Sequence, residues 1–386
     1  MPLTLFLLAL VVFAMGTSEF MLAGLLPGIA ADLHVSLGTA GLLTSAFAVG
    51  MVVGAPLLAA VSRRWPRRIT LIGCVLLFLT MHVIGALATD FTVLLLTRTA
   101  AAFANAGFLA VAVTAAVELV PPDRKARALA VLLGGTTLAT VVGVPGGAVL
   151  GGLLGWRTTF WTLALLCVPA LAGLLRVSFG RPDGPPDDLT TELAELRRPR
   201  LLLVLLLAAL VNAGTFGAFT FLAPVITEGA GLPEVPWVPV ALMAFGVGSF
   251  LGVTAAGRVA DRRPGLVVAV GGPALVVGWL ALAAAAGRPG PVLVLVPALG
   301  LLAFGVGSTL IARVLYAAAG APTMASSYAT AALNLGAVAG PVLAAGSIST
   351  GLAERGPAVT AAALVLAALL AAAVFRRLIL PARGRS

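Results

Sequence analysis

The sequence predicts an all-α polytopic membrane protein, with twelve transmembrane helices in two pseudo-symmetric six-helix bundles around a central cavity. Of its 386 residues, 60% are apolar and 10% are charged, whereas soluble proteins average about half apolar and a quarter charged. Apolar runs of about 20 residues, each long enough to cross a hydrocarbon core of about 30 Å, recur along the whole chain. The two halves of the chain also repeat each other.

The first half is expected to hold six spans, because basic residues collect in every second connection. The spans cover roughly residues 3–26, 37–60, 69–89, 92–117, 128–153 and 157–176. With the N-terminus inside, the inner connections hold Arg63, Arg64, Arg67, Arg68, Arg124, Lys125 and Arg127, and the outer ones hold only Arg157. Basic residues are enriched on the cytoplasmic side of membrane proteins, which orients this half.

The second half is expected to repeat this order. Its spans cover roughly residues 201–226, 237–257, 266–286, 291–316, 323–351 and 357–380. Its inner connections and tail hold Arg258, Arg262, Arg263, Arg313, Arg376, Arg377, Arg383 and Arg385, and its outer connections hold Arg288 and Arg355. With five arginines between the halves, 20 basic residues lie inside and three outside. We therefore expect a multi-pass protein of the inner (cytoplasmic) membrane with both termini in the cytoplasm.

A polar stretch from about Val177 to Arg200 separates the two blocks of helices, and its Pro, Gly and Asp content is typical of a linker. The expected domains are an N-terminal bundle (1–176), a cytoplasmic linker (177–200) and a C-terminal bundle with a short cytoplasmic tail (201–386).

The two blocks echo each other at one offset. "GTSEF" followed by "GLLP" (16–27) resembles "GTFGAF" followed by "FLAP" (214–224), and Pro145 in "GVPGG" matches Pro341 in "GAVAGP". Several echoes at one spacing indicate homologous halves, an arrangement typical of transporters that rock one bundle against the other around a site at mid-membrane.

Glu19 is the only acidic residue inside any expected span. A charge at the centre of a membrane helix costs roughly 2.5 to 3.5 kcal/mol on insertion scales, so such residues usually serve a function. Arg98 is the one basic residue deep in a span, and both charges lie at similar depth in the outer half of the membrane. We expect them to face each other across one cavity, where Glu19 loads and releases a proton. Two alternatives stay open: a fixed ion pair that only specifies packing, and an Arg98 bonded to backbone carbonyls.

Further polar and aromatic residues are candidates for the wall of the cavity. Asn105 lies seven residues beyond Arg98 and shares its helix face. The other candidates are Phe20, Phe108, Asn212, Phe216 and Asn334. Polar side chains also bond between helices purely for packing, and aromatic residues at helical spacing are often ordinary core residues.

Two glycine-containing segments are candidates for gating. "GVPGG" places Gly143, Pro145 and Gly147 in mid-helix, which allows a kink and close helix approach. "GRVADRRPG" places Gly257, Asp261 and Arg262 at an inner connection, where charge-assisted bonds can form a latch; the alternative is that these charges set topology alone.

Several functional classes find no support in the sequence. It has no phosphate-binding loop, dinucleotide fingerprint or nucleophile elbow, and no metal-spaced set of His or Cys. We therefore expect no enzyme activity, no cofactor and no metal. The net charge of +10 is explained by the basic inner connections and not by nucleic acid.

The chain resembles a known family over essentially its whole length. "GTSEFMLAGLLPGIAADLHVSLGTAGLLTSAFAVG" (16–50) is similar to the opening of bacterial chloramphenicol resistance exporters and of related sugar-efflux-like proteins. "LTRTAAAFANAGF" (96–108), "GVPGG" and "GRVADRRPG" resemble motifs of the twelve-span drug:proton antiporters of the major facilitator superfamily. The loop after the second span departs from the family pattern, because Arg63 stands where an aspartate is usual.

The resemblance implies a proton-coupled exporter of a small amphiphilic antibiotic, with chloramphenicol the first candidate, working by alternating access. It assigns proton coupling to Glu19, in agreement with the isolation of that residue in the sequence. The expected partners are a small-molecule drug, protons and the lipid bilayer, and the protein is expected to be a monomer. An exporter of sugars or other metabolites and a nontransporting membrane sensor remain the alternatives.

Overall fold

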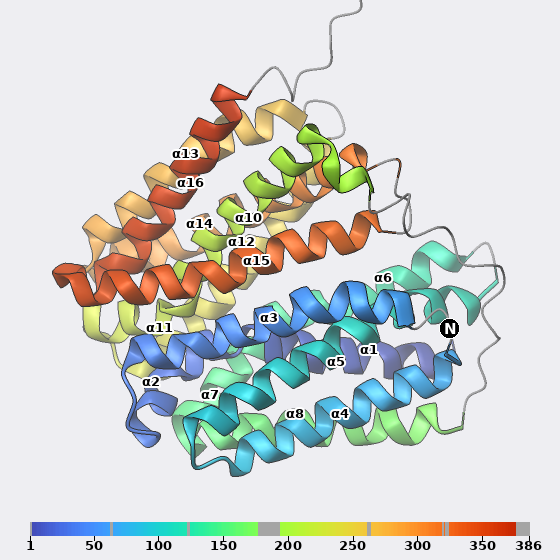
Figure 1. Ribbon diagram of the computed structural model, residues 1–386. Helices are drawn as coiled ribbons and strands as arrows, with labels where there is room; N and C mark the ends of the chain where they lie inside the picture. Colours follow the sequence, from blue (N-terminus) through green and yellow to red (C-terminus); the bar gives the residue numbers. More distant parts are fainter. Residues whose placement is uncertain are drawn as a thin grey trace, which may run out of the picture.

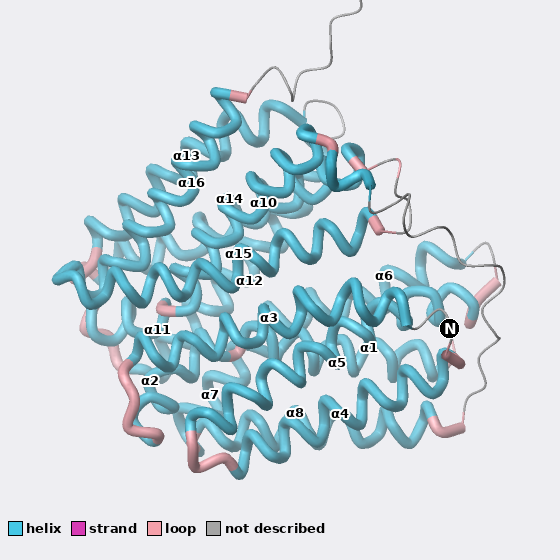
Figure 2. The backbone as a smooth tube through the Cα atoms, in the orientation of Figure 1, coloured by secondary structure: helices cyan, strands magenta, loops and turns pink. Residues whose placement is uncertain are grey.

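The computed structural model describes residues 2–61, 65–121, 124–176, 194–260, 264–318, 320 and 324–375. Within these ranges the chain consists of helices joined by turns and short loops, and it contains no strand (Figures 1 and 2). The predicted fold class is confirmed.

The helices of the first half follow the predicted spans closely. They are α1 (Leu3–Phe20), α2 (Leu22–Asp32), α3 (Leu37–Val61), α4 (Arg67–Leu87), α5 (Phe91–Glu118), α6 (Lys125–Leu138), α7 (Val144–Leu154) and α8 (Trp156–Leu174). The first span is broken at Met21, and a π-helical turn, Ala139–Gly143, joins α6 to α7. Pro145 follows this turn and has no N–H to donate, which favours an irregular hydrogen-bond pattern in the preceding residues.

The helices of the second half are α10 (Pro199–Thr220), α11 (Leu222–Pro224), α12 (Glu234–Ala260), α13 (Pro264–Ala285), α14 (Pro289–Ala317), α15 (Ala325–Ser347) and α16 (Gly356–Val374). Eleven described stretches are long and apolar enough to cross a membrane. One of them, Ala325–Val374, contains both α15 and α16 and spans 50 residues, so the described chain is consistent with twelve crossings.

Each half of the chain builds its own core. Phe78, Phe108 and Phe160 are buried in a cluster formed mainly by α1 to α8, and Trp279 and Phe245 in one formed mainly by α10 to α16. Many large apolar side chains on the outer helices are exposed, among them Leu96, Leu165, Val270, Val294 and Leu370. Apolar surface on this scale is expected to face lipid.

The two groups of helices meet along α3 with α15 and along α7 with α12. Ser45 of α3 donates a hydrogen bond to the carbonyl of Val338 on α15, at 2.8 Å. Gly246 of α12 packs against the backbone of Thr140, where a Cβ atom would lie 2.9 Å from the Thr140 carbonyl carbon. In Figure 1 the two groups converge where α2 and α11 lie and spread apart toward the N-terminus.

Candidate functional site

The end of α1 brings three candidate residues to the middle of the protein. Glu19 and Phe20 are half-buried in its final turn, and Ser18 beside them is fully buried. The Glu19 carboxyl group interacts with two side chains of α5, the charge of Arg98 and the amide of Asn105. The structure therefore brings together Glu19, Arg98 and Asn105, as their positions in the sequence suggested. Glu19 and Arg98 form no direct salt bridge.

Arg98 is held by α1 instead. It is 1% exposed, and its two terminal nitrogens donate to the hydroxyl and to the backbone carbonyl of Ser18, both at 2.6 Å. Its guanidinium carbon lies 4.5 Å from the centre of the Phe47 ring on α3, which adds a cation–π contact. Helix-end carbonyls lack intrahelical partners, so this contact stabilises the break after Phe20. In this conformation Arg98 is therefore bonded to a backbone carbonyl, which is one of the alternatives considered from the sequence.

A histidine extends the contact into the N-terminal core. The Ser18 hydroxyl lies 2.8 Å from Nε2 of His82, and Nδ1 of the same ring lies 2.8 Å from the Phe78 carbonyl oxygen. His82 is 1% exposed and packs against the rings of Phe78 and Phe160. The sequence offered no signal for Ser18, because a lone serine in an apolar helix is common.

The start of α5 is set by a cap that fixes the register of Arg98. Asp90 accepts hydrogen bonds from the backbone N–H groups of Thr92 and Val93, at 2.8 and 3.2 Å. These backbone bonds, that of Val93 first, lower the pKa of Asp90 below its ordinary value. An N-cap of this kind ends the connection before α5 and begins the helix at Phe91.

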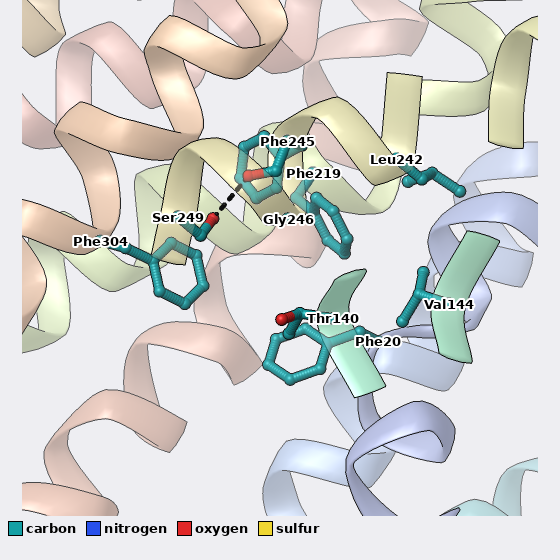
Figure 3. Close-up of a pocket in the computed structure, with 9 residues that line it drawn as sticks. All are labelled: Phe20, Thr140, Val144, Phe219, Leu242, Phe245, Gly246, Ser249 and Phe304. Carbon is teal, nitrogen blue, oxygen red and sulfur yellow. Dashed lines mark hydrogen bonds between the residues drawn. The ribbon is translucent and has the colours of Figure 1, made fainter. Parts of the chain in front are cut away.

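A pocket lies where the two halves of the chain meet (Figure 3), and Phe20, the residue after Glu19, is part of its wall. It is lined by Phe20, Thr140, Val144, Phe219, Leu242, Phe245, Gly246, Ser249 and Phe304. The first three come from the first half of the chain and the rest from the second. About 230 Å³ in it is free of atoms, part of it open.

Aromatic rings connect the pocket across the seam. The Phe20 ring lies 5.6 Å from that of Phe216 and 6.1 Å from that of Phe219. The centre of the Phe219 ring lies 4.8 Å from that of Phe245, and the centre of the Phe245 ring lies 6.0 Å from that of Phe304. These separations are typical of favourable ring pairs. An apolar surface thus runs from α1 through α10 and α12 to α14.

Other predicted cavity residues lie away from this pocket. Phe108 is fully buried in the N-terminal core. Asn212 donates to the carbonyl of Leu333 at 2.7 Å and joins α10 to α15, and Asn334 donates to Thr330 of its own helix at 2.9 Å. None of the three lines the pocket of Figure 3. In this conformation Phe108 is part of the core, and the two asparagine side chains donate to backbone carbonyls.

The predicted gating residues divide into two groups. Gly143 packs against the side chains of Thr17 and Phe13, and Pro145 beside it is buried. Gly147 packs against Thr159, whose hydroxyl donates to the Gly147 carbonyl at 2.9 Å. In the other segment, Gly257 has open space beside it. Asp261 and Arg262 lie outside the described residues.

A polar clamp joins three helices at one end of the first half. Arg157 at the start of α8 pairs with Asp32 at the end of α2 and donates to the Ala88 carbonyl after α4, at 2.9 Å. Trp156 also donates to Asp32, at 3.2 Å. The hydrogen bond from Arg157 is the main cause that lowers the pKa of Asp32.

Comparison with known proteins agrees with this architecture. Residues 8–341 match the Major Facilitator Superfamily. The chain belongs to this superfamily. It is 59% identical over 388 residues to a chloramphenicol resistance protein of Streptomyces lividans, covering 99% of this chain and 98% of the relative. It is 34% identical over 348 residues to the inner membrane transport protein YdhP of Escherichia coli (strain K12), covering 89% and 88%.

Solved structures of transporters share the fold of this superfamily member. A bacterial homolog of the human lysosomal transporter Spinster, inward-facing and unoccupied, matches with a TM-score of 0.76 at 19% identity, covering 97% of this chain and 95% of that one. The nucleoside transporter NupG matches with a TM-score of 0.78 at 13% identity, covering 98% and 99%. The resemblance predicted from the motifs is confirmed: the protein is a multi-pass membrane transporter, and these relations support efflux.

Proposed function

We propose that this transporter exports a small amphiphilic antibiotic, chloramphenicol first among the candidates, in exchange for protons. The 59% identity to a chloramphenicol resistance protein over nearly both full lengths supports the choice of cargo. The observation that carries the coupling is the placement of Glu19 directly before Phe20, which lines the pocket between the two halves.

The chemistry of the pocket suits a neutral aromatic ligand. Its lining contains no charged side chain and is rich in phenylalanine. Its two hydroxyls already donate to carbonyls of their own helices, Thr140 to Thr137 at 2.9 Å and Ser249 to Phe245 at 2.8 Å. Their oxygens remain able to accept, so the pocket favours a ligand that brings an aromatic ring and its own hydrogen-bond donors.

The coupling follows from the adjacency of the acid and the aromatic surface. A drug packed on Phe20 displaces the neighbouring turn of α1, which carries Glu19. If drug and proton favour different states of this turn, each lowers the affinity for the other. With a neutral drug and one proton per cycle, the exchange moves charge, and the membrane potential adds roughly 2.3 kcal/mol per 100 mV.

The proposed cycle uses the two halves of the chain as moving bodies. Residues 1–176 and 201–386 form the two bundles, which rock about the pocket, with Gly143, Pro145 and Gly147 at the hinge and the segment from Gly257 to Arg262 as the inner latch. The protein works as a monomer in the inner membrane with both termini in the cytoplasm, and it carries out no chemical conversion of its cargo.

Expression in a chloramphenicol-sensitive host tests this function. The parent chain is expected to confer resistance, and Glu19→Gln is expected to abolish it at equal abundance in the membrane. The matched control is Glu228→Gln, the same change at an exposed position, which should retain resistance. Resistance in Glu19→Gln would remove Glu19 from coupling. A sensitive host with the parent chain would refute chloramphenicol as cargo and favour the export of a metabolite.

A further inference from the structure

The donor and acceptor of each hydrogen bond around Ser18 can be assigned from the chemistry of its partners. The Phe78 carbonyl can only accept, so Nδ1 of His82 carries the proton that bonds to it. In the neutral ring Nε2 is then an acceptor, and the Ser18 hydroxyl donates to it. The lone pairs of the Ser18 oxygen are left for Arg98, which can only donate.

We propose that Ser18 and His82 are positioning residues that hold the Arg98 guanidinium on the end of α1 and away from the Glu19 carboxylate. The proposal rests on the proposed function, because it concerns the acid that couples proton to drug. Two terminal nitrogens of Arg98 are bound to Ser18, whereas its Nε atom is buried without a partner among the described residues. A buried donor without an acceptor is costly, so the guanidinium is poised to bind a carboxylate when its hold on Ser18 weakens.

Few other groups near α1 can titrate. In their membrane part, the helices packed on α1 carry Arg98 of α5 and Cys167 of α8. The helix α4, which contacts α1 through His82, carries Cys74 as well. Both thiols are buried in the core. The balance between an Arg98 bound to Ser18 and an Arg98 paired with Glu19 therefore sets the pH at which Glu19 gives up its proton.

Removal of the Ser18 hydroxyl should shift this balance. In Ser18→Ala one terminal nitrogen of Arg98 loses its acceptor, and a closer cation favours the ionised form of a carboxylate. In the proposed cycle drug and proton each lower the affinity for the other, so the ionised form of Glu19 binds the drug better. The midpoint of chloramphenicol binding against pH is therefore expected to move to lower pH by about one unit. His82→Phe keeps a ring between Phe78 and Phe160 and should move it in the same direction by less, since the Ser18 oxygen remains.

The test is equilibrium binding of chloramphenicol to the purified full chain across a pH series. Thr97→Ala is the control, because Thr97 directly precedes Arg98 in the chain, is buried, and donates its hydroxyl to Leu94 of its own helix at 2.7 Å. It should leave the midpoint unchanged. Should His82→Phe fail to insert, Ser18→Ala decides alone.

Three outcomes would contradict this inference, and the first of them leaves the function on which it rests intact. An unchanged midpoint in Ser18→Ala, with the pH dependence abolished in Glu19→Gln, would overturn the positioning role and leave coupling by Glu19 intact. A pH dependence that survives in Glu19→Gln would overturn both. A shift to higher pH in Ser18→Ala would show that Ser18 brings Arg98 toward Glu19, which is the reverse of the proposal.

Discussion

Substitution of Gly246 should disfavour the conformation described above, in which α12 packs closely against Thr140 of the first half. A Cβ atom at this position of α12 would lie 2.9 Å from the carbonyl carbon of Thr140 and 3.3 Å from Cα of Val141, so Gly246→Ala forces backbone apart across the seam. Overpacking of a well-packed site costs about 1 to 3 kcal/mol. If this cost applies only to the conformation described here, the population of that conformation relative to one in which the contact is open falls roughly 5- to 150-fold.

A disulfide across the seam can measure that population. A Cβ atom on Gly38 would lie 3.3 Å from that of Ala345, close to the roughly 3.5 to 4.5 Å of a disulfide. In a chain with Cys74 and Cys167 replaced by serine, Gly38→Cys with Ala345→Cys should therefore crosslink rapidly. Adding Gly246→Ala should slow this crosslinking markedly.

A neighbouring glycine separates conformational bias from general damage. Gly248 packs against the backbone of Pro297 within the C-terminal half, so Gly248→Ala crowds one bundle and leaves the seam alone. It is expected to lower thermal stability without slowing the crosslink. Equal crosslinking rates in Gly246→Ala and the parent would refute the reasoning, since they would show that the seam adapts to the added methyl group.

Two further predictions concern stability. Arg157 lowers the pKa of Asp32, so their ion pair stabilises the fold at pH values above the ordinary pKa near 3.8, and this stability is lost as the pH falls through the lowered pKa. Thermal unfolding in detergent should show this loss on acidification in the parent and a smaller loss in Arg157→Ala. Equal losses in the two proteins would exclude a contribution from the clamp. Gly340→Ala, which crowds Gly217 and neighbouring backbone of α10, should cost about 1 to 3 kcal/mol, whereas Gly346→Ala, with open space beside it, should unfold like the parent.

The spans were predictable from sequence because their signals are local. Long apolar runs suffice to locate the helices, whereas the orientation inferred from the arginines stays a prediction. The break at Met21 was not predictable, because it coincides with a bond from Arg98, 80 residues away, to Ser18. The π-helical turn before Pro145 is another local irregularity that depends on its packing.

The candidate site was predictable only where a residue is unusual in its surroundings. Glu19 and Arg98 stand out as charges among apolar neighbours, and the structure brings them near each other. Phe20 and Phe108 are the same residue type in similar runs, yet one lines a pocket and the other is core. Phe245 and Phe304 carried no signal, because their role depends on how α12 and α14 pack against the other half.

The hold of Ser18 on Arg98 has a consequence for biogenesis. A helix carrying an arginine at this depth enters the bilayer at a cost of about 2.5 kcal/mol or more on insertion scales. Its acceptor is synthesised first, 80 residues earlier, which at about 5 to 20 residues per second is a lead of several seconds. The Ser18 acceptor is therefore already made when α5 leaves the translocon, so the newly made arginine can be partnered by Ser18 on insertion.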